Sequence, residues 1–184
     1  MNNDLNELIL IERLRNPETQ RKAFEEVVRQ YSEQLYWQVR RIVLTHEDAN
    51  DVMQNVFLKA WTHLDSFHQD SKLMTWLYRI AINESLDFMR KQKAQQSLSA
   101  DDVDSGVANK LMADKYFDGD ETEAQLQEAL SKLPDVQRTV FNLRYFEDMK
   151  YSEISKILHT SEGALKASYH IAVKKITDFF NKLD

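Results

Sequence analysis

Glycine and proline are scarce in this chain, with only 3 Gly and 2 Pro among 184 residues. Strand-rich and α/β folds depend on frequent tight turns, which these two residues usually supply. Leu, Glu, Lys, Gln and Ala are abundant instead, and 42% of the residues are apolar, which is enough to bury helical cores. The composition therefore predicts an all-α protein.

Several broad classes of protein are disfavoured by what the sequence lacks. The chain has no cysteine, which excludes disulfide bonds and thiolate zinc sites. Its first residues, Met1 to Glu7, lack the basic segment of a signal peptide, and no stretch approaches the roughly 18 apolar residues of a membrane span. We expect a cytoplasmic protein with no membrane insertion.

The net charge of −6 is unevenly distributed. Residues 94–120 hold 2 basic and 6 acidic groups, a balance of −4, and lack periodic apolar residues. Residues 21–93 hold 11 basic and 10 acidic groups, and residues 121–184 hold 9 and 10. We therefore expect two small helical domains, residues 1–93 and 121–184, joined by a flexible acidic linker at 94–120.

Apolar residues recur at helical spacing throughout the first domain. A long helix is predicted up to about Val43, a second over 46–64 with Thr45 as its N-cap, and a third from Leu73 to about Lys93. Three packed helices of this kind make a domain. A short amphipathic segment precedes them, and its apolar residues are Leu5, Leu8 and Ile9.

The second domain has the outline of a helix-turn-helix protein. A short helix ends at Pro134, which also serves as a first-turn residue of the next helix. Glu147 and Asp148 then break the pattern, a helix covers 151–158, and a turn at His159 and Thr160 leads into a helix from Ser161 to about Leu183.

The last helix separates into an apolar and a basic face. No acidic residue lies between Gly163 and Lys175, and Ser161 is placed to cap the helix and leave its amides free for a phosphate. This is how a recognition helix is built, although a basic surface helix without DNA is the alternative. The predicted buried residues are Leu165, Tyr169, Ala172, Val173 and Ile176. The candidate DNA-binding residues are Ser161, Lys166, Ala167, Ser168, His170 and Lys174.

Two further candidate surfaces lie in the first domain. Four residues of the second helix share the face opposite its apolar stripe, at i, i+3, i+4 and i+7: Asp51, Gln54, Asn55 and Leu58. An exposed Leu rimmed by polar groups suits a protein contact, and a solvated face is the alternative.

The third helix carries a polar line, and a loop with an aromatic residue precedes it. These residue types suit phosphates and exposed bases, and the candidates are Phe67, His68, Arg79, Asn83, Asp87 and Arg90. Two structural alternatives remain: Trp76 as a core residue, and Asp87 with Arg90 as an i, i+3 ion pair.

No catalytic constellation is present, since the chain has no Gly-rich phosphate loop, nucleophile elbow or HExxH motif. His63 and His68 are five residues apart and have no acidic partners placed beside them. We therefore expect no enzyme activity, no metal site and no cofactor.

Four motifs in order resemble the extracytoplasmic-function (ECF) group of the sigma-70 family of RNA polymerase sigma factors. The segment DANDVMQNVFLKAW at 48–61 resembles region 2.2 of these sigma factors. The stretch from WLYRIAIN at 76–83 through Arg90 resembles their regions 2.3 and 2.4. The stretch from LSKLP at 130–134 to Phe146 resembles region 4.1, and residues 151–176 resemble region 4.2. Within it, GALKASY looks like the Bacteroidetes branch of the family.

The resemblance implies a role for each surface. Asp51, Gln54, Asn55 and Leu58 would bind the β′ clamp helices of core RNA polymerase, and the second domain would lie at the β flap. The polar line and the loop before it would read and melt the minus-ten element, and the last helix would read the minus-thirty-five element. Promoter DNA and an anti-sigma factor are the other implied partners.

Three positions depart from the family pattern. Asn55 replaces a frequent Glu, which puts the detailed pairing with polymerase in question. His159 stands where the turn often has Gly, although His tolerates a left-handed backbone. Ser168 stands where many members have Arg, which leaves Lys166 and His170 as the better DNA-contact candidates.

Two rival functions remain. A stand-alone helix-turn-helix regulator leaves the stripe on the second helix unexplained. A helical scaffold that binds only protein leaves the acid-free face of the last helix unexplained.

Overall fold

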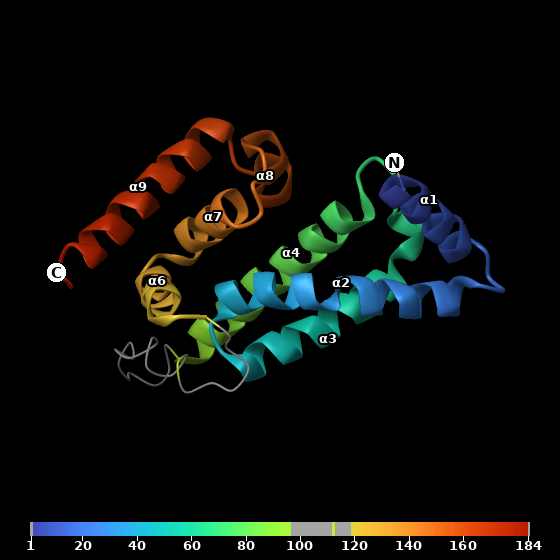
Figure 1. Ribbon diagram of the computed structural model, residues 1–184, viewed down its shortest axis with the longest axis horizontal. Helices are drawn as coiled ribbons and strands as arrows, with labels where there is room; N and C mark the ends of the chain where they lie inside the picture. The colour runs from blue at the N-terminus through green and yellow to red at the C-terminus, as the bar shows by residue number, and fades with distance from the viewer. Residues whose placement is uncertain (1, 97–111, 113–118, 184) are drawn as a thin grey trace.

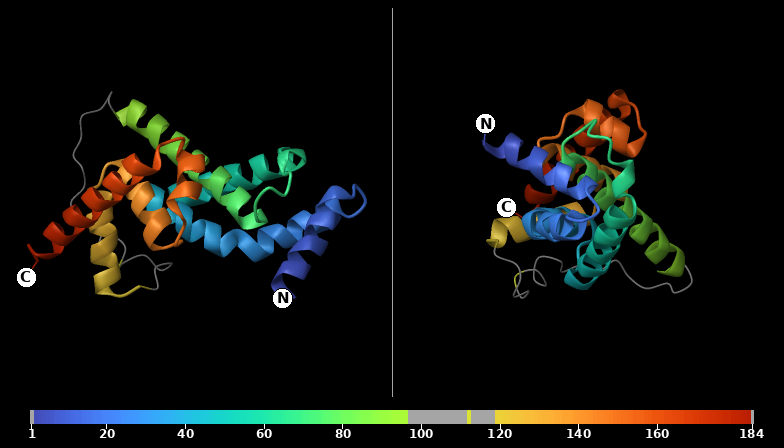
Figure 2. Two further views of the ribbon diagram at one scale, coloured as in Figure 1. Left: turned by 90° about the horizontal axis from the view of Figure 1, so that it is seen from above. Right: turned by 90° about the vertical axis from the view of Figure 1, so that its right-hand side faces the viewer.

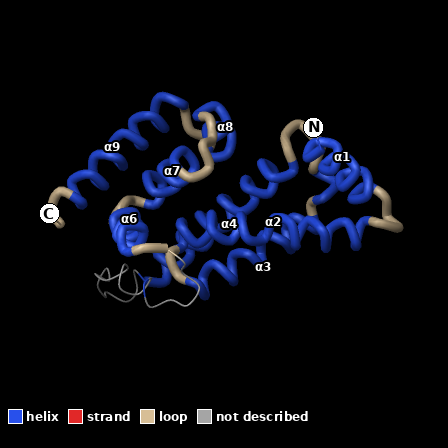
Figure 3. The backbone as a smooth tube through the Cα atoms, in the orientation of Figure 1, coloured by secondary structure: helices blue, strands red, loops and turns tan. Residues whose placement is uncertain are grey.

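The computed structural model describes residues 2–96, 112 and 119–183 of the chain. All regular secondary structure in these residues is helical, as the sequence predicts (Figures 1 and 3). The first domain contains α1 (Asn2–Arg15), α2 (Gln20–Val43), α3 (His46–Thr62), the short 3-10 helix η1 (Leu64–Ser66) and α4 (Leu73–Gln96). The second contains α6 (Glu121–Ser131), α7 (Asp135–Tyr145), α8 (Tyr151–Leu158) and α9 (Glu162–Phe180).

Helices α2, α3 and α4 pack against one another and form the three-helix core expected of the first domain (Figures 1 and 2). Each contributes a stripe of buried apolar side chains, among them Leu35, Val56 and Leu77. Helix α4 runs to Gln96, three residues past the predicted end at Lys93. Most of the predicted linker at 94–120 lies outside the described residues.

Helix α1 packs on α2 through a different face from the one predicted. Leu5, Leu8 and Ile9 are exposed, while Leu10, Ile11 and Leu14 are buried. Both sets have helical spacing, so periodicity alone allows either, and contact with α2 selects the second. A carboxylate on α1 also accepts a hydrogen bond from the start of α4, with 2.7 Å between Glu7 Oε1 and Leu73 N.

Two predicted helix caps, one in each domain, are confirmed. Thr45 Oγ1 accepts a hydrogen bond from Asp48 N at 3.1 Å, and Ser161 Oγ accepts one from Ala164 N at 3.3 Å. His159, at the end of α8, has a φ of 50°. This is the left-handed conformation that favours Gly, the residue frequent at this turn in the family, and that His also tolerates. Pro134 is the N-cap of α7 and not, as predicted, a residue of its first turn.

In the second domain, α6, α7 and α9 surround a small core that includes Leu130, Phe141, Ala172 and Ile176. Of the residues predicted to be buried on α9, Leu165, Ala172 and Ile176 are buried, Tyr169 is half-buried, and Val173 is 37% exposed. Because the core is small, α9 buries only a narrow stripe there and leaves the flanking Val173 in solvent.

The two domains pack directly against each other. Helix α7 contacts α2 and α4, and Figure 1 shows it beside them. The buried side chains Val140, Leu143 and Met149 of the second domain belong to the same apolar cluster as the core of the first. Sequence periodicity predicts each domain but gives no sign of this contact.

Candidate functional site

One candidate surface lies on the outer face of α3. Its four predicted residues, Asp51, Gln54, Asn55 and Leu58, are all exposed, and the opposite face is buried. Leu58 is 62% exposed. Exposure on this scale, together with polar neighbours one turn before it, fits an apolar anchor with a hydrogen-bonding rim.

Trp61 extends this surface, although the sequence analysis did not include it among the candidate residues. It is 39% exposed, although its ring also packs edge-on against Phe24 with centroids 5.1 Å apart. Its spacing of three residues from Leu58 is the signal that could have placed it on the same side of the helix.

The polar line on α4 is exposed at Arg79, Asn83 and Arg90, while Asp87 is half-buried. Asp87 and Arg90 form an ion pair, as the structural alternative predicts. Arg79 and Asn83 are therefore the two exposed residues of this line that have no acidic residue between them, whereas Arg90 is already paired with a carboxylate.

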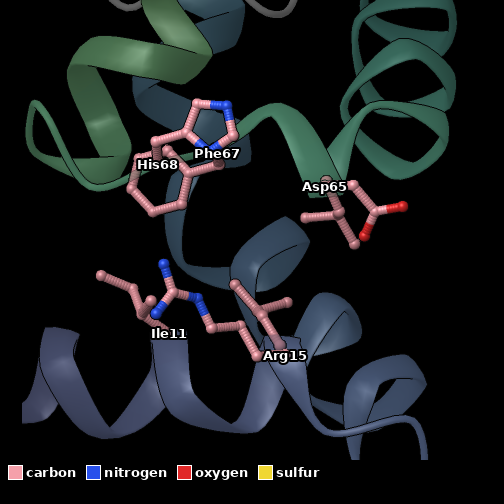
Figure 4. Close-up of a pocket in the computed structure, with 7 residues that line it drawn as sticks. Ile11, Arg15, Asp65, Phe67 and His68 are labelled. Atoms are coloured by element: carbon pink, nitrogen blue, oxygen red, sulfur yellow. The ribbon is translucent and has the colours of Figure 1, made fainter.

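A pocket of about 190 Å³ lies between α1 and the loop that follows α3 (Figure 4). In Figure 4, Phe67 and His68 approach from the loop, and Ile11 and Arg15 approach from α1. The lining residues are Ile11, Leu14, Arg15, Leu64, Asp65, Phe67 and His68. The pocket thus combines an apolar lining with three ionisable side chains, and it depends on the packing of α1, which no local sequence pattern reveals.

The two loop candidates differ in accessibility. Phe67 is only 7% exposed, and its ring packs on Trp76 with centroids 5.3 Å apart. Trp76 is itself buried, in agreement with the core alternative. His68 is exposed. Phe67 therefore contributes a wall of the pocket, and His68 is free to contact a ligand from the outside.

The outer face of α9 is the third surface. Lys166, Ala167, His170 and Lys174 are exposed, and Ser168 is half-exposed. Gly163 has open space where a side chain would begin, so the first turn is unobstructed.

Lys166 is held loosely on this face. Its Nζ lies 4.0 Å from Glu162 Oε2 and 5.7 Å from the centre of the Tyr151 ring. An exposed pair of this length contributes little, so the ammonium group can turn to a phosphate at small cost. Tyr169, on the inner side, has a pKa above the ordinary value because burial disfavours the phenolate.

The comparisons with known proteins cover both domains. The family model for Sigma-70 region 2 matches residues 27–95, and that for Sigma-70, region 4 matches residues 123–176. The ECF RNA polymerase sigma factor SigW of Bacillus subtilis is 32% identical over 156 residues, which cover 80% of this chain and 83% of that protein. The chain belongs to the ECF sigma factors. The ECF sigma-E factor of Escherichia coli is 29% identical over 91% of this chain and 90% of its own.

Two solved structures share the fold of this ECF sigma factor. One is the sigma factor RpoE in complex with the anti-sigma factor NepR from Bartonella quintana, with a TM-score of 0.69, 22% identity and coverage of 87% of this chain and 98% of that one. The other is CnrH in complex with the cytosolic domain of CnrY, with a TM-score of 0.65, 22% identity and coverage of 96% and 97%.

Two kinds of feature are absent from the described residues. None of the helices there is long and apolar enough to cross a membrane. No group of three or more His, Cys, Asp or Glu side chains in that part of the chain is arranged to hold a metal ion.

Proposed function

We propose that this ECF sigma factor binds core RNA polymerase and directs promoter-specific initiation by recognising the minus-thirty-five and minus-ten elements and helping to melt the DNA. One observation carries the proposal: the exposed anchor on α3 and the exposed basic face of α9 lie within the two segments that match sigma regions 2 and 4. A stand-alone helix-turn-helix regulator needs only the surface on α9, and a scaffold that binds only protein needs only the surface on α3.

Polymerase binding is assigned to the α3 surface. Leu58 inserts into an apolar contact on the β′ clamp helices, and Asp51, Gln54 and Asn55 supply the surrounding hydrogen bonds. The departure at Asn55 makes this rim less acidic than in relatives that carry Glu. The second domain lies near the β flap.

DNA recognition is divided between the domains. On α9, Lys166, Ala167, Ser168, His170 and Lys174 face the major groove of the minus-thirty-five element, and Ser161 directs helix amides at a phosphate. In the first domain, Arg79 and Asn83 contact the minus-ten strand, with Asp87 and Arg90 beside them and Phe67 and His68 in the loop.

Melting requires that unpaired bases be held. Unstacking costs a few kcal/mol per base step, and capture of an extruded base in a shaped pocket offsets that cost. The pocket beside Phe67 and His68 has an apolar lining, and the side chains of Arg15 and Asp65 also line it. This combination suits a nucleobase, which is a flat ring with polar edges. The protein assists opening by binding, without bond chemistry of its own.

Several finer assignments belong to the same proposal. We assign residues 1–93 to polymerase and minus-ten contacts, 94–120 to a linker and 121–184 to the minus-thirty-five reader, which accords with the matched ranges. The site of action is the cytoplasm, and the motif at 163–169 suggests the Bacteroidetes branch. An anti-sigma factor is a further partner, because both solved relatives were captured with partner proteins, one of them described as an anti-sigma factor.

Run-off transcription on genomic fragments with purified core polymerase tests the proposal. We expect discrete transcripts only when the protein is added. A regulator would alter transcription by an existing holoenzyme and give none with core enzyme alone, and a scaffold would change neither reaction.

A further inference from the structure

The loop between α3 and α4 is held at both ends, and one of the two anchors comes from α1. At the start of the loop, the Phe67 ring is buried against Trp76, and Phe67 N donates a hydrogen bond to Leu64 O at 3.0 Å. At its end, the backbone N–H of Leu73, the first residue of α4, donates a hydrogen bond to Glu7 Oε1 at 2.7 Å. The second anchor therefore joins residues 66 positions apart in the sequence.

Glu7 acts on α4 as a capping side chain that comes from another helix. The first four N–H groups of an α-helix have no partner inside the helix, and the helix dipole favours a negative charge beside them. In its own first turn, residues 73–76, α4 carries no acidic residue. The same carboxylate lies close to α2, because burial, followed by the charge of Glu7, raises the pKa of Tyr31 above its ordinary value.

One stripe of α1 runs along the loop. Glu7, Ile11 and Arg15 are spaced at i, i+4 and i+8, which places them on the same side of the helix. Ile11 and Arg15 line the pocket that Phe67 and His68 close from the loop (Figure 4). Glu7 bonds the other end of the loop. Helix α1 therefore spans the loop from one anchor to the other.

Helix α1 is itself fixed to the segment that begins α2. Arg13 Nη1 lies 2.7 Å from Glu26 Oε2. Thr19 Oγ1 donates a hydrogen bond to Arg13 O at 2.8 Å. Gln20 Nε2 donates one to Leu14 O at 2.9 Å. Because α2 belongs to the three-helix core, these contacts allow α1 to hold the loop in a fixed position relative to that core.

The middle of the loop has a backbone conformation that needs such support. Gln69 has a φ of 62°, in the left-handed region that residues other than Gly seldom adopt. A backbone of this kind persists only where the surrounding structure holds it, and it is common in segments that bind ligands. His68, Gln69 and Asp70 are exposed. The loop thus presents its middle residues to solvent while both of its ends are held.

We propose that Glu7 is a positioning residue for the minus-ten strand: its hydrogen bond to Leu73 N fixes the end of the loop and keeps the pocket at Phe67 in the shape that captures an unpaired base. Glu7 itself does not touch DNA. This role rests on the proposed function, which assigns the loop to the minus-ten element. Glu7 lies in residues 2–26, outside the segment 27–95 that matches Sigma-70 region 2, so the family match assigns it no role.

Loss of the Glu7 carboxylate should loosen the loop and leave the rest of the domain folded. When only a fraction of the molecules hold the competent shape, the apparent affinity for the unpaired strand falls by that fraction. We expect Glu7→Ala to slow promoter melting about 10-fold, which corresponds to about 1.4 kcal/mol and is the size of effect that loss of a helix cap produces. The Kd for core polymerase should not change, because the α3 surface is left intact.

Two measurements on the full-length chain test the proposal. In the free protein, amide hydrogen exchange followed by NMR should show a protected Leu73 N–H in the parent and an unprotected one in Glu7→Ala. In the holoenzyme assembled with purified core polymerase, 2-aminopurine fluorescence in the minus-ten element should report the slower melting of a duplex promoter. The Kd for core enzyme is measured in parallel.

Glu12→Ala is the matched control. It removes the same side chain from an exposed position of the same helix, and it should leave the Leu73 exchange rate and the melting rate unchanged. Glu7→Gln keeps an oxygen that can accept the hydrogen bond but loses the charge. It should retain the protection of the Leu73 amide and slow melting only about 3-fold.

Glu7→Gln also serves if Glu7→Ala does not fold, as judged by circular dichroism, and a melting rate equal to that of the parent would then overturn the proposal. Equal exchange of the Leu73 amide in Glu7→Ala and the parent would overturn the contact. Lost protection with an unchanged melting rate, or an equal loss of core binding, would overturn the positioning role. Failure of the proposed function would appear separately, because the parent holoenzyme would then melt no promoter while the exchange result would stand.

Discussion

Substitution of the exposed Leu58 by Asp is expected to abolish binding to core polymerase without disturbing the fold. Leu58 is 62% exposed, on the order of 100 Å² of apolar surface, and burying it in a contact is worth about 2.5 kcal/mol at ~25 cal/mol per Å². That loss alone weakens the Kd about 70-fold. A carboxylate buried without a partner adds several kcal/mol more.

The assay is a pull-down or fluorescence titration with purified core enzyme, with helicity followed by circular dichroism. Leu5→Asp is the matched control, because Leu5 is 57% exposed on α1, away from the α3 surface. We expect binding by this control and none by Leu58→Asp at equal helicity. Equal affinity of Leu58→Asp and the parent would refute the assignment of the polymerase surface.

Three further predictions concern DNA and stability. Lys166→Ala and His170→Ala should impair transcription from duplex promoters more than from templates with a preformed bubble. Asn83→Ala should remain defective on templates with a bubble. Equal defects on both templates would contradict the division of DNA recognition between the two domains. The free chain should bind a promoter duplex weakly, as measured by fluorescence anisotropy at about 150 mM salt. Deletion of most of residues 97–120 should raise that binding modestly at low salt. Nanomolar binding by the full-length free chain would favour a stand-alone regulator. Thr45→Ala should lower the free energy of unfolding by about 1 kcal/mol in urea titration, since Thr45 caps α3; an unchanged midpoint would show that the cap contributes nothing.

Local sequence rules predicted the parts of this molecule that depend on one helix at a time. The caps at Thr45 and Ser161 and the turn at His159 were predicted from residue type and position, whereas the left-handed backbone at His159 was suggested by the resemblance to the family. The outward stripe that ends at Leu58 was also predicted, because the register of a helix fixes which side chains share a face. The functional roles given to these residues stay predictions until they are measured.

The burial of several side chains was predicted wrongly where contacts between different elements decide it. Helix α1 has two possible stripes, and the choice of Leu10, Ile11 and Leu14 depends on α2. Val173 lies at the edge of a narrow core and is exposed. Phe67 was proposed as an accessible aromatic residue, yet it is buried on Trp76.

The sequence by itself determined that the chain is helical, where most helices begin, and which residues form the outer faces of α3, α4 and α9. Those properties follow from backbone hydrogen bonding and periodicity over a few turns. Only the tertiary structure decided that α1 completes a pocket with the loop at Phe67 and that Glu147 joins Arg41 and Tyr78 across the domains. Residues about 50 or more positions apart in the sequence meet at both places, and their contact depends on how whole helices pack, which no local period encodes.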